Sequence, residues 1–457
     1  MTALDSGSAG TRRIARGVAA NALSFTTSTG MQIVTVPVLI HFWGLSLYGV
    51  WVILSTIPSY LALSNVGVAM AAGNELAALL TVGDRARARV VYGTAATIIG
   101  TLSLAALVGG TTIAALMPAH IMPVHPQVSP NGMRGVIIAL VLYGVAVVVS
   151  ELPMAKYRAT GRYARGTSIM TAVLFVERAA VLGAAAFGFV PAAVLFTAVR
   201  LCGTAWMLID ASRAHLDLRP RLRDASWTEA KRLALLGSGM ILYTVAMAVN
   251  LQGPVVVLGA ALAPAAVGLF SATRTLTRLG IQATGIITAS VNAEFSIVWG
   301  SPATARRRRL FALTFVVSAT IMATFLIALL LFGQDVARLW LVGTAQPSFA
   351  LIALLAIGSA LQGCWLAIGS LILAANRQFA FTPAALFIAV ATLAPATFVV
   401  PRWGVEGMAA LLCAAEAVTV LWVYRQAARV GVGSVFEAPR DAAAMAREWL
   451  QRRRRAA

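Results

Sequence analysis

RRRRLFALTFVVSATIMATFLIALLLFG, residues 306–333, is the stretch that decides the fold class of this chain. Four arginines stand directly before 24 uncharged residues that are rich in Leu, Ile, Phe, Val and Ala. A helix of about twenty apolar residues spans the hydrocarbon layer of a bilayer. Arginines at its end are attracted to anionic lipid headgroups. The stretch therefore predicts a transmembrane helix with its basic end at one membrane face.

The rest of the chain repeats this composition. Of its 457 residues, 59% are hydrophobic and 11% are charged, and the mean hydropathy is +0.83. Soluble domains are about a quarter charged. Apolar runs bounded by charges or by Pro and Gly predict spans at 17–40, 48–70, 90–117, 134–153, 167–189, 192–210, 233–260, 265–290, 310–333, 348–375, 380–400 and 405–426. We expect an all-α integral membrane protein of about twelve transmembrane helices.

The basic residues predict the orientation of these spans. If both termini are cytoplasmic, the predicted inside segments hold 29 of the 36 Lys and Arg residues. The predicted outside segments hold Arg134, Arg338 and Arg402. This asymmetry follows the positive-inside rule. The net charge of +20 therefore reports topology, and the clusters 306–309 and 452–455 are expected to contact anionic membrane lipids and no nucleic acid.

A weak internal repeat divides the chain into two halves. Gly161-Arg162-Tyr163-Ala164 corresponds to residues 376–380, and Pro37 followed by Gly49 recurs as Pro254 followed by Gly268. Each copy holds six spans, and an even number gives both copies the same orientation. We expect two six-helix bundles with pseudo-two-fold symmetry and a central cavity. The predicted divisions are a basic segment 1–16, bundles 17–210 and 233–426, a basic linker 211–232 and a basic tail 427–457.

Ionisable residues inside a membrane are costly and mark functional sites. In the expected eighth span, Ser271, Arg274, Arg278 and Gln282 are spaced by 3, 4 and 4 residues and would share one helix face. Two arginines one turn apart repel each other, which favours a wet cavity or an anionic ligand. The alternative is structural pairing with Glu151, Glu177 or Glu416.

Uncharged polar residues predict further cavity lining. Asn21, Ser24, Ser28 and Gln32 form a similar stripe on the first span, and Asn250 interrupts the seventh. Such stripes also serve helix packing, where Ser and Thr let backbones approach. Prolines, including Pro254, interrupt several spans and predict bent helices.

Glu177 and Arg178 lie midway along the fifth span. Adjacent helix residues point about 100° apart and cannot pair with each other. Arg200, in the sixth span, is a predicted partner for Glu177. Structural pairing is the simpler interpretation, while Glu177 and Glu151 are also candidates for carrying a coupling proton or sodium ion.

The sequence predicts no metal, cofactor or intrinsic ATPase. Neither lysine belongs to a GxxxxGK[ST] phosphate-binding loop. The three cysteines lie in apolar segments without CxxC spacing, and His41, His120, His125 and His215 lack metal-ligand spacing. A membrane glycosyltransferase or polymerase is disfavoured, because the loops are poor in acids and the longest expected outside loop, 118–133, is short.

Several motifs carry a family resemblance. The first half contains PVLI at 37–40, Gly44, YGVW at 48–51, YLALSNVG at 60–67 and Asn74. The second half contains VGLFSA at 267–272 and GVEGMA at 404–409. Over residues 17–426 the chain resembles the polysaccharide-biosynthesis (Wzx-type) flippases of the multidrug/oligosaccharidyl-lipid/polysaccharide exporter superfamily.

This resemblance implies a translocase, not an enzyme, in the bacterial inner membrane. It would move an undecaprenyl-diphosphate-linked oligosaccharide to the periplasmic leaflet by alternating access, for O-antigen, capsule or exopolysaccharide synthesis. The diphosphate would bind Arg274 and Arg278, with Arg178 and Arg200 as further candidates, since arginine suits phosphate oxygens. A polysaccharide polymerase is an expected partner. The alternative function is a multidrug/ion antiporter of the related extrusion branch.

Overall fold

The computed structural model describes residues 3–63, 66–119, 122, 125–214, 218, 222–299, 304–444, 447 and 451. Side chains are described within these ranges except at 3–22, 66, 238–240, 286, 287, 289, 290, 293, 296 and 297. The side chain of Asn21 and the residues His120, His215 and Arg452–Arg455 therefore lie outside the description.

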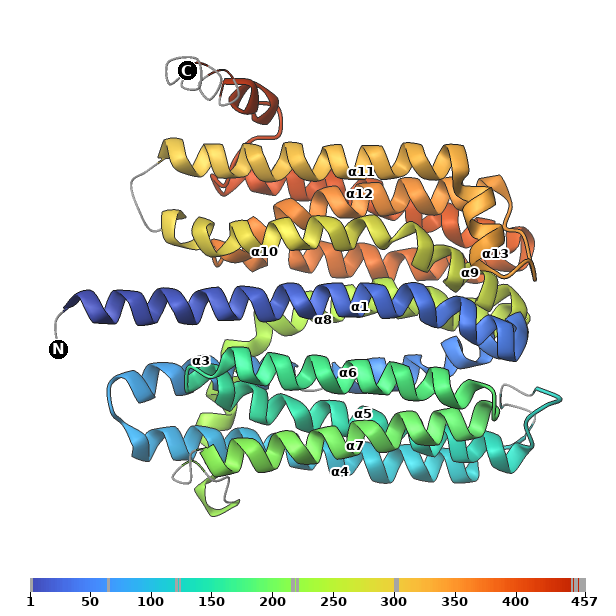
Figure 1. The fold of residues 1–457 in the computed structure, drawn as a ribbon, viewed down its shortest axis with the longest axis horizontal. Coiled ribbons are helices and arrows are strands. Elements are labelled where there is room, and N and C mark those ends of the chain that lie inside the picture. The colour runs from blue at the N-terminus through green and yellow to red at the C-terminus, as the bar shows by residue number, and fades with distance from the viewer. Residues whose placement is uncertain are drawn as a thin grey trace. The chain divides into compact units, whose positions relative to one another are not determined.

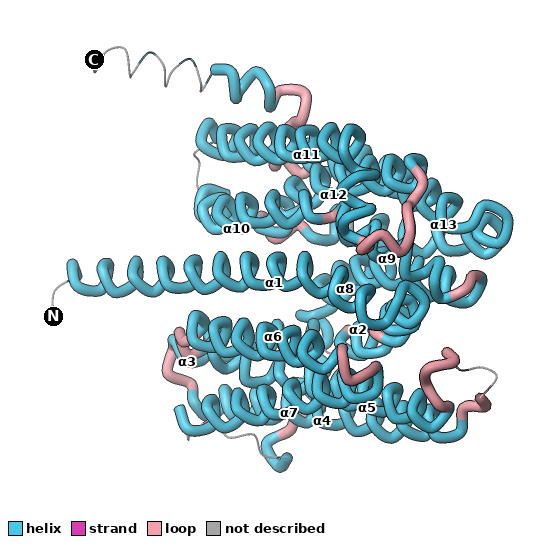
Figure 2. The backbone as a smooth tube through the Cα atoms, turned by 45° about the vertical axis from the view of Figure 1, so that its right-hand side comes forward, coloured by secondary structure: helices cyan, strands magenta, loops and turns pink. Residues whose placement is uncertain are grey.

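The described chain is built from helices (Figure 2). The α-helices are α1 (Ala3–Leu54), α2 (Thr56–Ala62), α3 (Val66–Thr81), α4 (Arg85–Leu116), α5 (Pro130–Ala159), α6 (Tyr163–Ala185), α7 (Phe189–Ala214), α8 (Trp227–Ala261), α9 (Pro264–Thr277), α10 (Leu279–Trp299), α11 (Thr304–Trp340), α12 (Phe349–Ala374) and α13 (Thr382–Arg429). Short 3-10 helices lie at Leu222–Asp224 and Gln378–Ala380. The predicted all-α class is confirmed.

Nine helical segments in the described residues are long and apolar enough to cross a membrane. The longest is α13, with 48 residues. At 1.5 Å per residue it is about 72 Å long, roughly twice the thickness of the hydrocarbon layer. The chain is a multi-pass membrane protein, as predicted.

Two long helices bend at glycines that lie between predicted spans. Gly44 in α1 has φ 69° and ψ 170°, and Gly404 in α13 has φ 56° and ψ −142°. A positive φ is strained for residues with a Cβ, so glycine permits these bends. The bends separate 17–40 from 48–70 and 380–400 from 405–426.

Two predicted spans are interrupted in the structure. The expected span 48–70 is divided among the end of α1, all of α2 and the start of α3, which continues to Thr81. In the expected span 265–290, a one-residue turn at Arg278 separates α9 from α10. Neither of these two spans is one uninterrupted helix.

The chain forms two compact units. Unit 1 comprises residues 1–248 and 263–268, and unit 2 comprises residues 249–262 and 269–457. The chain therefore passes from one unit to the other three times, within α8, between α8 and α9, and within α9. In unit 1, α5 packs against α2, α3, α4, α6 and α7, and α1 packs against α6. The helices α5, α6 and α7 run side by side (Figure 1). In unit 2, α12 packs against α10, α11 and α13.

Close packing in unit 1 depends on glycine. A Cβ at Gly49 in α1 would lie 1.7 Å from the carbonyl oxygen of Pro264, and one at Gly268 would lie 2.5 Å from that of Leu45. The end of α1 and the start of α9 therefore approach each other backbone to backbone. Small residues permit this kind of approach between membrane helices.

Candidate anion-binding site

A cluster of polar side chains lies inside unit 2, where four helices meet. Asn250 comes from α8, Arg274 from α9, Gln362 from α12 and Glu416 from α13. Arg278 occupies the turn after α9. Discontinuous helices that expose polar groups are typical of transporter binding sites.

Asn250 connects the members of this cluster. Its side-chain oxygen Oδ1 accepts a hydrogen bond from Arg274 Nη2 at 3.4 Å and one from Gln362 Nε2 at 3.3 Å. Its amide nitrogen Nδ2 donates to Glu416 Oε1 at 2.9 Å. Its backbone carbonyl accepts from Arg274 Nη2 at 2.9 Å. One neutral side chain thus links an arginine, a glutamine and a carboxylate.

The two arginines have different surroundings. Arg274 is 8% exposed, and its Nη1 also donates to the backbone oxygen of Leu251 at 2.9 Å. Arg278 is half-buried, and its Nη1 donates to Gln362 Oε1. That is the one hydrogen bond that the Arg278 guanidinium makes to the described residues.

Glu416 is 5% exposed, and its carboxylate is held by neutral donors. Trp365 Nε1 donates to Glu416 Oε2 at 2.6 Å, while Asn250 donates to the other carboxylate oxygen. No arginine lies within ion-pairing distance of this carboxylate among the described residues. The predicted alternative of direct pairing with Glu416 is therefore wrong for both arginines, although all three groups share one cluster.

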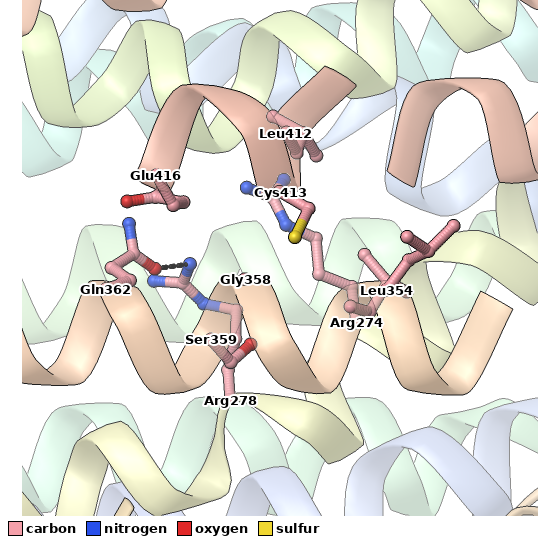
Figure 3. Close-up of a pocket in the computed structure, with 10 residues that line it drawn as sticks. Arg274, Arg278, Leu354, Gly358, Ser359, Gln362, Leu412, Cys413 and Glu416 are labelled. Carbon is pink, nitrogen blue, oxygen red and sulfur yellow. Dashed lines mark hydrogen bonds between the residues drawn. The ribbon is translucent and has the colours of Figure 1, made fainter. Parts of the chain in front are cut away.

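A small pocket opens beside this cluster (Figure 3). Arg274, Arg278, Gln362, Cys413 and Glu416 line it together with Leu354, Leu355, Gly358, Ser359 and Leu412. About 270 Å³ of space lies among and beside these residues, a figure that includes space open to solvent. The enclosed part has room for about one water molecule, so a larger group would enter only if the lining side chains moved apart.

The charges in this pocket favour an anion. Two guanidinium groups and one carboxylate line it, which leaves one positive charge in excess. An uncompensated charge in a low-dielectric setting is strongly unfavourable. A bound anion would neutralise it, and an arginine with unused N–H donors offers charge-assisted hydrogen bonds.

Of the polar stripes predicted from sequence, Arg274 and Arg278 line this pocket, whereas their described uncharged members do not. Ser271 is buried and its hydroxyl has no hydrogen-bond partner among the described residues, whereas Gln282 is half-buried beyond the turn. On α1, Ser24 and Gln32 are half-buried and Ser28 is exposed. Of the predicted lining residues, the structure brings Asn250 together with Arg274 and Arg278.

A second polar cluster lies inside unit 1. Glu177 on α6 is fully buried, and its Oε1 lies 2.5 Å from Arg200 Nε on α7. Arg200 Nη2 donates to Glu177 Oε2 at 3.1 Å and to the Tyr143 hydroxyl at 3.0 Å. That hydroxyl donates to Glu177 at 3.2 Å. The predicted pairing of Glu177 with Arg200 is confirmed, and this cluster is balanced in charge.

The other predicted candidates in unit 1 lie outside that cluster's hydrogen bonds. Arg178 is exposed, as expected for the residue next to a buried one on a helix. Glu151 on α5 lies 3.7 Å from Arg158, about two turns further along the same helix. Glu151 and Glu177 therefore have partners in unit 1, Arg158 and Arg200 respectively. The predicted alternative that either acid pairs with Arg274 or Arg278 is wrong.

Four residues in and around the pocket were not predicted as site residues. All four lie in apolar spans: Gln362, Trp365, Cys413 and Glu416. The sequence suggests Glu416 as a partner for an arginine and not as a site residue. Gln362 interrupts α12 as Gln282 interrupts α10, so the search for polar residues within spans could have found it. Trp365 and Cys413 carry no such signal, because both types are common in membrane helices.

No protein-family model and no curated protein match this sequence. Solved structures do match. A lipid II flippase, MurJ, in an inward closed conformation aligns with a TM-score of 0.70 at 10% identity, covering 93% of this chain and 90% of the other. A multidrug resistance MATE family transporter of the MOP superfamily, inward-facing, gives 0.63 at 15% identity, covering 89% and 94%. An outward-facing one gives 0.60 at 15% identity, covering 94% and 96%.

These likenesses establish the fold. The alignments cover nearly the whole of both chains at 10–15% identity, so this chain shares the fold of these transporters. Fold alone does not define a substrate. The substrate must be argued from the pocket.

Proposed function

We propose that this protein is a flippase for lipid-linked oligosaccharides in the bacterial inner membrane. Its substrate would be an undecaprenyl-diphosphate-linked oligosaccharide for O-antigen, capsule or exopolysaccharide synthesis. The observation that carries the proposal is the positive excess in the unit 2 pocket, where two arginines accompany one carboxylate. A diphosphate matches that excess and the donor geometry of arginine.

The pocket would have to widen to admit a diphosphate, because its enclosed part is small in this structure, and an oligosaccharide or a polyprenyl chain would need still more room. In the proposed complex the diphosphate occupies the pocket and the lipid chain stays in the bilayer. The glycan contacts polar residues elsewhere, with Ser24, Ser28 and Gln32 as candidates.

The proposed transport cycle is alternating access without hydrolysis of ATP. We propose twelve spans in two six-helix bundles, at 17–210 and 233–426, with both termini cytoplasmic. The bends at Gly44 and Gly404 support this number, since each divides a helix that is too long for one crossing. A polysaccharide polymerase and anionic lipids are proposed partners.

Reconstituted protein tests this function. Proteoliposomes would carry an undecaprenyl-diphosphate-linked sugar, and appearance of the sugar in the outer leaflet would be followed with a glycosidase. We expect Arg278→Gln to lower the transport efficiency by about 10- to 100-fold, since charge-assisted hydrogen bonds contribute about 1.5–3 kcal/mol. Arg402→Gln, which changes an exposed arginine of the same unit, is the control. Equal transport by both variants would contradict the proposed site.

Multidrug antiport is the second candidate. It is supported by structural likeness to MATE proteins, one of which, DinF-BH, is described as a multidrug transporter. A cationic drug would need the Glu416 carboxylate, which Asn250 and Trp365 already engage. Efflux of a cationic dye such as ethidium from cells that express the protein, abolished by Glu416→Gln, would favour this function over the flippase.

A further inference from the structure

Pro254 lies in the interior of α8, seven residues before its end. Proline has no backbone N–H, so the carbonyl four residues earlier loses its intrahelical hydrogen bond. That carbonyl belongs to Asn250. In a bilayer no water is present to replace the missing donor, and a neighbouring group must supply one.

Arg274 supplies the missing donor. Its Nη2 lies 2.9 Å from the backbone oxygen of Asn250, and its Nη1 lies 2.9 Å from that of Leu251. Both carbonyls belong to the turn that Pro254 disrupts. One planar guanidinium therefore spans two adjacent carbonyls, which arginine does better than a point charge such as lysine.

These bonds engage three of the five N–H donors of the Arg274 guanidinium, which leaves fewer for a ligand than Arg278 has. Both terminal nitrogens already donate to α8, and Nη2 also reaches Asn250 Oδ1. The side chain also packs beside the Phe270 ring, with 5.9 Å between the guanidinium carbon and the ring centroid. Arg278, in contrast, is half-buried and uses Nη1 alone for its bond to Gln362.

We propose that the two pocket arginines have separate tasks, an inference that rests on the proposed function. Arg278 contacts the diphosphate. Arg274 is a positioning residue that replaces the N–H missing at Pro254 and fixes the turn of α8 around Asn250. Through Asn250 Oδ1 it orients Gln362, whose own side-chain oxygen receives the bond from Arg278.

A double-mutant cycle between Arg274 and Pro254 tests this assignment. Pro254→Ala returns a backbone N–H to position 254, so the Asn250 carbonyl no longer needs Arg274. We expect R274Q to lower the Tm by several degrees and the maximal flipping rate at least threefold. The double variant R274Q/P254A should recover at least half of the loss in Tm and at least half of the loss in flipping rate. P254A should give R278Q no such recovery of flipping.

Binding of inorganic pyrophosphate separates positioning from ligand contact. It can be followed as protection of Cys413, which lines the pocket, from a thiol reagent in a variant with Cys202→Ser and Cys364→Ala. We expect the apparent Kd of R274Q/P254A to stay within threefold of the parent value and that of R278Q to rise at least tenfold. If R274Q/P254A bound pyrophosphate as weakly as R278Q, Arg274 would be a ligand contact and the inference would be wrong.

Arg274→Lys keeps the test decisive if P254A does not fold. A lysine ammonium can donate to one of the two carbonyls, so R274K should have a Tm between those of the parent and R274Q. A Tm equal to that of R274Q would overturn the proposed role. If the parent flipped no lipid-linked sugar, the proposed function would fail, while the melting and pyrophosphate data would still decide the tasks of the arginines.

Discussion

Replacing Arg200 with Met should destabilise unit 1 strongly. Arg200 is 4% exposed and Glu177 is fully buried, and their closest atoms are 2.5 Å apart. Arg200 also donates to Tyr143, whose ring stacks on Phe196 at 4.2 Å between centroids. The substitution would leave the Glu177 carboxylate buried with the tyrosine hydroxyl as its remaining partner.

The magnitude follows from the burial of this pair. Removing one member of a buried ion pair costs about 3–5 kcal/mol, because the other charge stays uncompensated. For a unit of about this size, each kcal/mol lowers the Tm by roughly 2–4 °C. We therefore expect R200M to melt roughly 6–20 °C below the parent. E177Q/R200M should recover much of this loss, since both charges are then absent.

Melting of the detergent-purified protein, followed by circular dichroism or by tryptophan fluorescence, measures these shifts. Arg178→Met is a matched control, because Arg178 adjoins Glu177 in sequence but is exposed, and it should change stability by less than about 0.5 kcal/mol. An R200M protein that melts with the parent would refute the reasoning. An E177Q protein of normal Tm that had lost the dependence of transport on a proton or sodium gradient would instead assign Glu177 to ion coupling.

Three further predictions concern packing, charge and the chain's end. Gly49→Ala places a Cβ 1.7 Å from a backbone oxygen of α9 and should lower the free energy of unfolding by about 1–3 kcal/mol. Gly30→Ala is the control and should not lower it, because no atom lies within 4 Å of the added Cβ. Equal melting temperatures of the two variants would contradict the close approach of α1 and α9. Cys413 should react several-fold faster with an anionic than with a cationic methanethiosulfonate, and the ratio of the two rates should fall as the salt concentration rises. A ratio of rates near one would argue against an excess of positive charge in the pocket. Arg308→Glu breaks an exposed ion pair with Glu437 and should cost less than about 1 kcal/mol by chemical denaturation, so a larger loss would show that the pair anchors the tail.

Hydropathy predicted most of the helices because the bilayer imposes one length on every crossing. The predicted span 310–333 lies within α11, and 348–375 nearly coincides with α12. The ends of these helices were harder to predict. The helix α11 begins at Thr304, so the four arginines are helical, and polar helix beyond the apolar run has no hydropathy signal.

The interrupted spans show where the periodicity of polar residues is insufficient to predict which side chains meet. Ser271, Arg274, Arg278 and Gln282 share one face of an ideal helix, but a turn interrupts the helix at Arg278, and of the four residues Arg274 and Arg278 line the pocket. No proline or glycine stands at that turn, and the nearest glycine, Gly280, follows it by two residues. Arg278 donates a hydrogen bond to Gln362 on α12, and a single sequence does not report such contacts between helices.

The partners of the pocket residues were the least predictable part. Asn250 and Glu416 are 166 residues apart in sequence, and their hydrogen bond depends on how α8 packs against α13. The composition of the site was easier to predict than its pairing, because an ionisable residue within an apolar span is visible in the sequence, whereas its partner depends on helix packing. The Glu177–Arg200 pair was predictable because the two lie on consecutive helices, where few other partners exist.

The distribution of charge and space in unit 2 bears on the specificity of the proposed flippase. The charged and amide groups that line the pocket are two guanidinium groups, the Gln362 amide and the Glu416 carboxylate, and the pocket is too small for several sugars. Affinity would then come from the diphosphate, which every undecaprenyl-linked oligosaccharide shares, and selectivity among glycans would need contacts outside this pocket. Two substrates that differ in their distal sugars should therefore show similar KM values in proteoliposomes. If one distal sugar changed KM tenfold or more, the glycan would contribute as much binding energy as the proposed diphosphate contact, and the pocket would be part of a larger site.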